Sequence, residues 1–326
     1  MSDVDTNSSI TAQQYVDALR RQGKRAFLAG DRVLWQYSEW AALERQPLFC
    51  FDIPSTREIR ALLWHTRSVV ASYVLPADDA HPGNSWLYLC ENRDYRLEDL
   101  ASAARRDARR ALRAFRYEFI DAATLLAHGA RAFCDTRTRV GLSDGTLQVF
   151  QDYIGMLSLN PACKFVGAWC GERLAAYLWM SLVDDWAAIA AYAANEDLRS
   201  CPNNGLIHFA LDYCLTQGRC SLVTYGLTSI QEVNRTVTLD YFKKKVGFEA
   251  RPVYRAFVYH PLLRPLVNPL TYWILRRCSR LFPHSPTLRK AAGLLATSLG
   301  EPLRIDAPAV ADRNSQQQDN RHEDLE

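Results

Sequence analysis

The residues with the clearest chemical potential form a short turn at positions 200–205. The run Ser200-Cys201-Pro202-Asn203-Asn204-Gly205 precedes an apolar segment with helical spacing, LIHFALDYCL. A small-residue turn at a helix N-terminus directs several unpaired backbone N–H groups toward one point, with the positive end of the helix dipole behind them. Such a point binds phosphate. We therefore predict a phosphate site formed by Ser200, Asn203, Asn204 and Gly205.

A second candidate anion site lies nearer the N-terminus. Six arginines stand between positions 105 and 116, and most recur at intervals of three to four residues, which places several on one face of a helix predicted over 97–115. Guanidinium groups bind phosphate through paired hydrogen bonds. Arg106, Arg109 and Arg110 are therefore candidates for binding a phosphate-bearing acceptor substrate. A solvated charged helix and an RNA-binding surface are the open alternatives, although no aromatic residues are interleaved for base stacking.

Short apolar runs predict the elements that position the turn. Residues 164–170, 174–183 and 186–193 are separated by tight polar turns and predict three consecutive antiparallel strands. After the turn we predict a helix that ends at Gly218, a strand over 222–227, a helix over 233–246 and a strand over 248–258. The first part of the chain predicts further strands and a helix with a capping box between Ser55 and Glu58. These further strands are predicted at 33–37, 47–53, 69–75 and 86–90.

This order of elements resembles the GNAT superfamily of acyltransferases, and more narrowly the branch that includes the Fem-type peptidyl transferases. The resemblance rests on Tyr192, the 200–205 turn, the strand LVTYG and the segment LDYFKKKVGFEARPVY. In that segment, Phe242-Lys243 followed by Gly247-Phe248 is similar to the FKxxFG signature of the branch. The commoner glycine pattern of the superfamily, Q/R-x-x-G-x-G/A, is absent, and only Arg199 and Gly205 loosely match it. The resemblance implies an α+β fold, with a mixed central sheet flanked by helices, in two GNAT-like halves of which the first is degenerate.

The resemblance also implies an activity. An amine would attack the thioester of acetyl-CoA or another acyl-CoA directly, in a slot between splayed strands near 186–194 and 222–226. The turn would hold the coenzyme A pyrophosphate, with Tyr225, Phe242 and Lys243 as further cofactor-binding residues. The candidate base and the candidate acids or thiolate partners are Glu196, Tyr192 and Tyr241.

Each of these candidates has a structural alternative. The alternative for Glu196 is an acid at the approach to a helix or on the surface, and the alternative for each tyrosine is a packed aromatic residue with its hydroxyl at an edge. Cys201 stands near a helix N-terminus, which favours a thiolate, but no spacing in the sequence positions a histidine beside it for nucleophilic catalysis.

The C-terminal part has a distinct character. No acidic residue occurs from 251 to 300, and the segment NPLTYWILRRCSRLF combines three arginines with large apolar residues. This composition is typical of a helix that lies in an anionic membrane interface, whereas simple packing on the protein is the alternative. We predict four parts: a degenerate half with the arginine-rich helix (1–130), a catalytic half (131–262), basic amphipathic helices (263–300) and a disordered tail (301–326).

Composition limits the function classes. The 326 residues are 48% hydrophobic, which suffices for two modest domains, and a net charge of +3 does not by itself indicate nucleic acid. Nine scattered cysteines without zinc spacing are typical of a reducing cytoplasm, and we expect no metal site. With no signal sequence or membrane-spanning run, we expect a cytoplasmic protein, peripheral on the inner face of the membrane.

The partners follow from these expectations. We predict an amine acceptor on a small molecule or a lipid-linked cell-envelope precursor. Two alternatives remain open: an aminoacyl-tRNA-dependent Fem-like transferase, for which tRNA would be the nucleic-acid partner, and a non-catalytic, membrane-associated binding module of the same fold.

Overall fold

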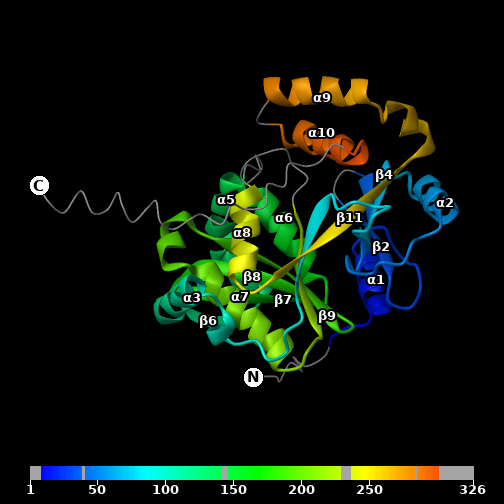
Figure 1. The fold of residues 1–326 in the computed structure, drawn as a ribbon. Helices are drawn as coiled ribbons and strands as arrows, with labels where there is room; N and C mark the ends of the chain where they lie inside the picture. The colour runs from blue at the N-terminus through cyan, green and yellow to red at the C-terminus, as the bar shows by residue number, and fades with distance from the viewer. Residues whose placement is uncertain (1–8, 39–40, 141–145, 229–235, 283–284, 301–326) are drawn as a thin grey trace, which may run out of the picture.

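The computed structural model describes residues 9–38, 41–140, 146–228, 236–282 and 285–300. In this part of the chain one mixed sheet of 11 strands is flanked by helices (Figure 1), which confirms the predicted α+β class. The strands are β1 (Ala26–Leu28), β2 (Leu34–Ser38), β3 (Ala42–Gln46), β4 (Val70–Pro76), β5 (Ser85–Cys90), β6 (Arg116–Ile120), β7 (Cys163–Cys170), β8 (Arg173–Val183), β9 (Trp186–Ala193), β10 (Leu222–Leu227) and β11 (Glu249–Tyr259).

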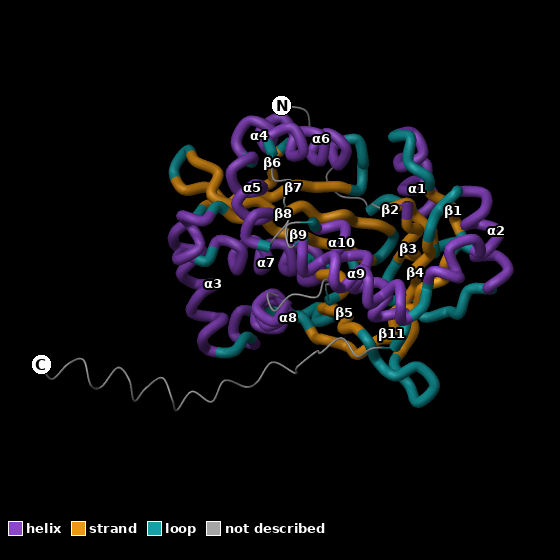
Figure 2. The backbone as a smooth tube through the Cα atoms, turned by 90° about the horizontal axis from the view of Figure 1, so that it is seen from above, coloured by secondary structure: helices purple, strands orange, loops and turns teal. Residues whose placement is uncertain are grey.

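The α-helices lie between these strands and after the last one. They are α1 (Ala12–Arg21), α2 (Thr56–Thr66), α3 (Ser102–Ala114), α4 (Ala122–His128), α5 (Ala130–Arg139), α6 (Leu147–Ser158), α7 (Pro202–Leu211), α8 (Thr236–Lys245), α9 (Pro269–Leu281) and α10 (Pro286–Ser298). The view from above shows helices on both sides of the sheet (Figure 2).

Apart from the edge strand β6, the strand order is symmetrical about the central pair of β11 and β5. It runs β1-β2-β3-β4-β11-β5-β10-β9-β8-β7-β6. Among the described strands, β3 with β4 and β9 with β10 are the parallel pairs, and each is joined through one helix, α2 or α7. This repeated unit is the two-part plan that the resemblance implied. At the centre, β11 pairs with β4 and β5, so strands from before and after residue 130 alternate there. The predicted domain boundary at that residue stays a prediction.

Three local predictions in the first part of the chain are wrong. Residues 47–53 form no strand, because the strand lies earlier, at Ala42–Gln46, and ends before Pro47, which has no backbone N–H to donate. Ser55 precedes α2, but its side chain makes no capping hydrogen bond, so the capping box with Glu58 is absent. The helix predicted over 97–115 begins as a 3₁₀ turn, and only Ser102–Ala114 is α-helical.

The strands and helices predicted around the 200–205 turn are present among the described residues, whereas positions 233–235 of the helix predicted over 233–246 lie outside them. β7, β8 and β9 form the antiparallel meander, and their turns contain the left-handed residues Gly171 and Asp184. The helix after the turn begins at Pro202, although its α-helical part ends at Leu211 and a π-helical segment, Asp212–Thr216, precedes Gly218.

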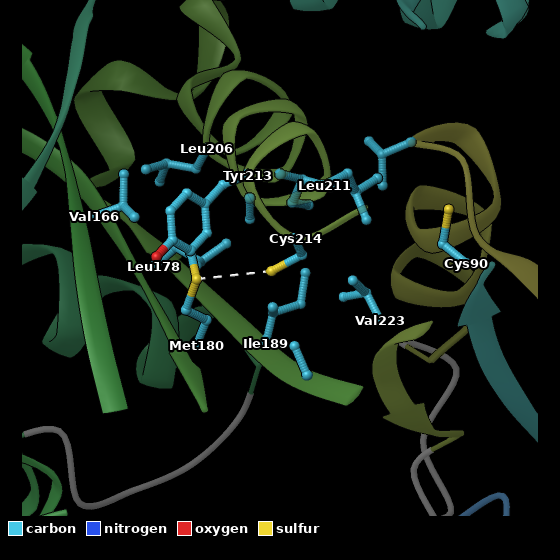
Figure 3. Packing of buried hydrophobic residues seen from close by; sticks show 14 of the residues in the cluster. Cys90, Val166, Leu178, Met180, Ile189, Leu206, Leu211, Tyr213, Cys214 and Val223 are labelled. Atoms are coloured by element: carbon cyan, nitrogen blue, oxygen red, sulfur yellow. Dashed lines mark hydrogen bonds between the residues drawn. The ribbon is translucent and has the colours of Figure 1, made fainter. Parts of the chain in front are cut away.

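The main core fixes α7 against the sheet. Leu206 and Leu211 of α7 and Cys214 of the following π-helical segment pack with strand residues such as Leu178 and Met180 (Figure 3). The sulfur atoms of Cys214 and Met180 are 3.9 Å apart. Because α7 is buried on most of its surface, its N-terminus is held in one position relative to β9 and β10.

The C-terminal helices form a separate layer at one end of the molecule, with α9 outermost (Figure 1). The hydroxyls of Tyr259 on β11 and Ser298 on α10 lie 2.6 Å apart and connect this layer to the sheet. Among the described residues, no helix has the length and apolar character needed to span a bilayer. The predicted disordered tail, 301–326, lies outside the described residues.

Candidate active site

The parallel strands β9 and β10 separate toward their carboxyl ends. They pair at three positions, Trp186 with Leu222, Ala187 with Val223 and Ala188 with Thr224, and no further pairing joins their described residues. Beyond this point the hydroxyl of Tyr225 hydrogen-bonds with the backbone of Ala191, and burial raises the pKa of Tyr225. The predicted separation of the strands is therefore present, and the side chain of Tyr225 bridges it.

A buried lysine lies at this opening. Lys243, on α8, is 2% exposed, and its Nζ donates a hydrogen bond of 3.1 Å to the carbonyl oxygen of Leu227. The same Nζ lies 4.4 Å from the ring centroid of Tyr88 and 5.3 Å from that of Tyr225. Burial lowers the pKa of Lys243 to about 8, against an opposing effect of Asp240. A cation with a perturbed pKa at a strand opening marks a candidate catalytic position.

Asp240 and Tyr88 complete this cluster, and the sequence analysis missed both. Asp240 is buried one turn before Lys243 and hydrogen-bonds with Tyr88 and Thr228. Burial raises its pKa. The available signal was an acid three residues before a lysine in LDYFKKK, since that spacing shares a helix face. The resemblance named Lys243 as a cofactor-binding residue, but nothing in the run of three lysines indicated that this one is buried beside an acid.

The chain itself occupies part of the predicted phosphate turn. The Asn204 N–H donates to the carbonyl oxygen of Cys201 (2.9 Å), and the Tyr117 hydroxyl of β6 donates to that of Pro202 (3.3 Å). The same hydroxyl lies 2.1 Å from the position that a Cβ would take on Gly205. Glycine at this position therefore permits the close approach of Tyr117. Asn203 keeps a buried Oδ1 with no hydrogen-bond partner in the described chain, and Ser200 is half-buried.

The two predicted anion sites are neighbours in space. Helix α3 packs along α7, and Arg110 donates a hydrogen bond of 3.1 Å to the carbonyl oxygen of Arg199. An ion pair between Lys245 and Asp107 links α3 to α8 as well. On the outer side of α3 the arginine side chains surround a hollow of about 580 Å³, lined by Arg105, Arg106, Arg109, Arg110 and Arg113.

The predicted base lies in a surface ion-pair network. Glu196 contacts Arg131 at 2.6 Å and Arg173 at 2.7 Å, and Arg173 also binds Asp197 through two hydrogen bonds. None of these contacts involves the residues around Lys243. The network joins the segment after β9 to α5 and to the start of β8, which is a structural role for the carboxylate.

The other predicted catalytic residues are dispersed. Tyr192 stacks on Tyr177, with ring centroids 4.9 Å apart, and its hydroxyl contacts that of Tyr153 at 3.3 Å. Tyr241 is 54% exposed, and so lies away from the buried face of α8, whereas Phe242 packs against the main core.

The surroundings of Cys201 do not favour a nucleophilic thiolate. Burial raises the pKa of the Cys201 thiol, which disfavours the thiolate that nucleophilic catalysis requires. Across the described residues, no group of three His, Cys, Asp or Glu side chains is arranged to hold a metal ion.

Comparisons identify the fold. No protein-family model matches the sequence, and no curated protein matches it. Among solved structures, FemX is similar with a TM-score of 0.54 at 11% identity, over 78% of this chain and 94% of that chain. L-PGS from Bacillus licheniformis also matches, with a TM-score of 0.47 at 13% identity, over 79% of this chain and 94% of that chain. A GCN5-related N-acetyltransferase from Kribbella flavida matches with a TM-score of 0.43 at 12% identity, over 78% of this chain and 97% of that chain.

The chain therefore has the GNAT fold, and it shares that fold with FemX over most of its length. The resemblance noted in the sequence is confirmed at the level of the fold.

Proposed function

We propose that this protein is a GNAT-type acyltransferase that transfers an acyl group to an amine by direct attack, with the reacting carbonyl at the opening between β9 and β10. One observation carries the proposal: β9 and β10 part after three pairs, and the buried ammonium of Lys243 lies at the opening. Negative charge develops on the carbonyl oxygen during acyl transfer, and a fixed cation in a buried site stabilises it. We assign this role to Lys243.

The donor that we propose is an acyl-CoA, bound along the opening with its phosphates toward the N-terminus of α7 and the arginines of α3. Ser200, Asn203, Asn204, Gly205, Tyr225 and Phe242 stay its proposed contacts. This assignment is supported by the positions of α7 and α3, which lie side by side.

A second donor is favoured by Tyr117. Its hydroxyl lies against Gly205, where a pyrophosphate would approach the backbone most closely. A donor whose phosphates bind mainly to the arginine face of α3 avoids this obstacle. An aminoacyl-tRNA is such a donor, because its backbone phosphates bind cationic side chains.

Binding experiments separate the two donors. Acetyl-CoA, longer acyl-CoAs and free coenzyme A are tested by thermal shift, because a ligand of the native state raises its stability. Transfer RNA is tested by electrophoretic shift at rising salt, because phosphate contacts weaken as salt increases. A coenzyme shift supports the first donor, and salt-sensitive tRNA binding alone supports the second. If neither ligand binds, the protein is a non-catalytic module of this fold and the transferase proposal is wrong.

We also propose that α9 holds the protein at the inner face of an anionic membrane, as a peripheral protein, with the acceptor amine on a small molecule or a lipid-linked precursor. Large apolar residues of α9 and its C-terminal cap face outward: Leu270, Trp273, Ile274, Leu281 and Phe282. The guanidinium of Arg277 lies 4.6 Å from the ring centroid of Trp273. Exposed aromatic and aliphatic residues with interspersed arginines suit the interface between lipid headgroups and chains.

A further inference from the structure

A large cavity lies between the sheet and the C-terminal helices. Its volume is about 710 Å³, within the range of small-molecule binding sites. Strands β3, β4, β10 and β11 form one wall, and the segment 263–267 with helices α9 and α10 forms the other. None of the residues assigned above to the donor lines this cavity.

The two walls differ in chemistry. The helical wall is mostly apolar and includes Leu275, Leu294 and Leu295, with Thr271 and Lys290 as its polar residues. The strand wall carries an ion pair of 3.2 Å between Glu44 and Arg255. The Nε of Arg255 is buried and has no hydrogen-bond partner among the described residues. Since a buried donor without an acceptor is costly, this wall favours a ligand that brings an acceptor group.

The cavity also reaches the candidate active site. Leu227 lines the cavity, and its carbonyl oxygen accepts the hydrogen bond from the Nζ of Lys243. Gly226, the residue before it, also lines the cavity, and no atom lies within 4 Å of the position its Cβ would take. A ligand along the strand wall therefore lies next to the residue that contacts Lys243.

We propose that this cavity binds one hydrocarbon chain of a membrane amphiphile, with the chain along the α9–α10 wall and the polar group at the strand wall near Arg255. On the basis of the proposed acyl transfer, the amphiphile is the acceptor of the acyl group.

The cover of the cavity indicates that the chain comes from a membrane. Leu275 and Thr271 of α9 face the cavity, whereas Trp273 and Ile274 of the same helix are 52% and 46% exposed. One helix thus separates the cavity from a surface suited to a lipid interface. The charge agrees, since residues 251–300 contain no acid. An amphiphile therefore has to cross only this helical layer to reach the cavity.

A chain-length series tests the proposal. Lysophosphatidylglycerols of increasing chain length, kept below their micellar concentrations, are titrated into the full chain by calorimetry. These probes carry no amine, so binding is measured without any transfer. Each methylene that enters the cavity lowers Kd by about fourfold, and Kd levels off once the cavity is full. A Kd that does not depend on chain length overturns the proposal.

Matched substitutions locate the chain. Ala291→Trp places a large side chain in the cavity from the helical wall. It is expected to shorten the chain length at which Kd levels off and to raise the Kd of the longest-chain lipid at least tenfold. Ala127→Trp, on the exposed surface of α4, is the control and should change neither quantity. An unchanged plateau in folded Ala291→Trp contradicts the assignment.

Photo-crosslinking of the wild-type protein covers the case in which Ala291→Trp does not fold. A lysophosphatidylglycerol with a diazirine at the end of its chain should label Leu275 or Leu294. Labelling confined to Trp273 would mean adsorption to the outer surface only and would overturn the proposal.

Comparing the binding of palmitoyl-CoA with that of the lysolipid distinguishes a donor site from an acceptor site. If palmitoyl-CoA binds and the lysolipid does not, the cavity serves the donor's chain, and the proposal of a membrane amphiphile is wrong. Donor binding tested with acetyl-CoA or tRNA is independent of this cavity, so failure of the proposed function and failure of the cavity assignment give different results.

Discussion

The hydroxyl of Tyr117 lies 2.1 Å from the position that a Cβ on Gly205 would take, so β6 and the first turn of α7 meet where only glycine fits. Gly205→Ala should therefore reduce the free energy of unfolding by about 1–3 kcal/mol, through overpacking, as measured by urea denaturation.

The matched control is Gly155→Ala on α6, where no atom lies within 4 Å of the added Cβ. That substitution should be neutral or stabilising by up to about 1 kcal/mol, because alanine has the higher helix propensity. In a Tyr117→Ala background, Gly205→Ala should cost less. An equal cost in both backgrounds would show that the two residues are not coupled.

The burial of Lys243 makes stability depend on pH. Its pKa is lowered from 10.5 to about 8 in the folded protein, so the unfolded chain binds more protons between these two values. Stability from this group therefore rises with pH across that window, by on the order of 3 kcal/mol in total. Compared with Lys243→Met, the wild type should gain stability between pH 8 and pH 10 in urea unfolding. Parallel pH profiles would contradict the buried position of the ammonium.

Lys243 and Glu196 should differ in their effect on transfer. Lys243→Met is expected to lower kcat by about 10²–10³, as the loss of one donor to a developing oxyanion does. Glu196→Gln should leave kcat unchanged and cost at most about 1 kcal/mol of stability, because its ion pairs lie near the surface. Steady-state kinetics with the donor identified by binding measures both. The opposite ranking would restore Glu196 as the base.

The arginine face of α3 should bind the donor's phosphates. Arg106→Glu is expected to weaken donor binding at least tenfold at low salt, with a smaller difference at high salt because the attraction is screened. The control is Arg60→Glu, an exposed charge reversal on α2, far from α3 in sequence. Equal effects of the two reversals would indicate a response to net charge rather than a site.

The outer face of α9 should determine membrane association. Trp273→Gln combined with Ile274→Gln is expected to reduce cosedimentation with vesicles of anionic phospholipid by at least tenfold, because two large apolar side chains no longer enter the interface. Leu147→Gln, which changes a similarly exposed leucine on α6, is the control. Unchanged cosedimentation of the double variant would remove α9 as the contact surface.

Much of the second half of the fold was predictable because its signals are local. Short apolar runs and tight turns specify β7, β8 and β9, and Pro202 after a polar turn specifies the start of α7. The wrong prediction of a strand at 47–53 has a local cause too. The apolar run there favoured a strand, whereas β3 ends at Gln46, directly before Pro47.

The active-site residues depended on contacts between distant segments. Lys243, Lys244 and Lys245 are chemically identical in the sequence, yet the first is buried over Tyr88, the second lies over Trp86 and the third pairs with Asp107. No local pattern predicts these different surroundings, because the partners come from β5 and α3.

The sequence by itself determined the GNAT-like order of elements, the glycine at 205 and the arginines of α3, since these follow from residue type and short-range spacing. Only the tertiary structure decided that Tyr117 lies against that glycine, that Lys243 is the buried cation, and that a cavity separates α9 from the sheet. The physical reason is that burial and its effect on a pKa arise from packing between segments far apart in the sequence, which no periodicity along the chain encodes.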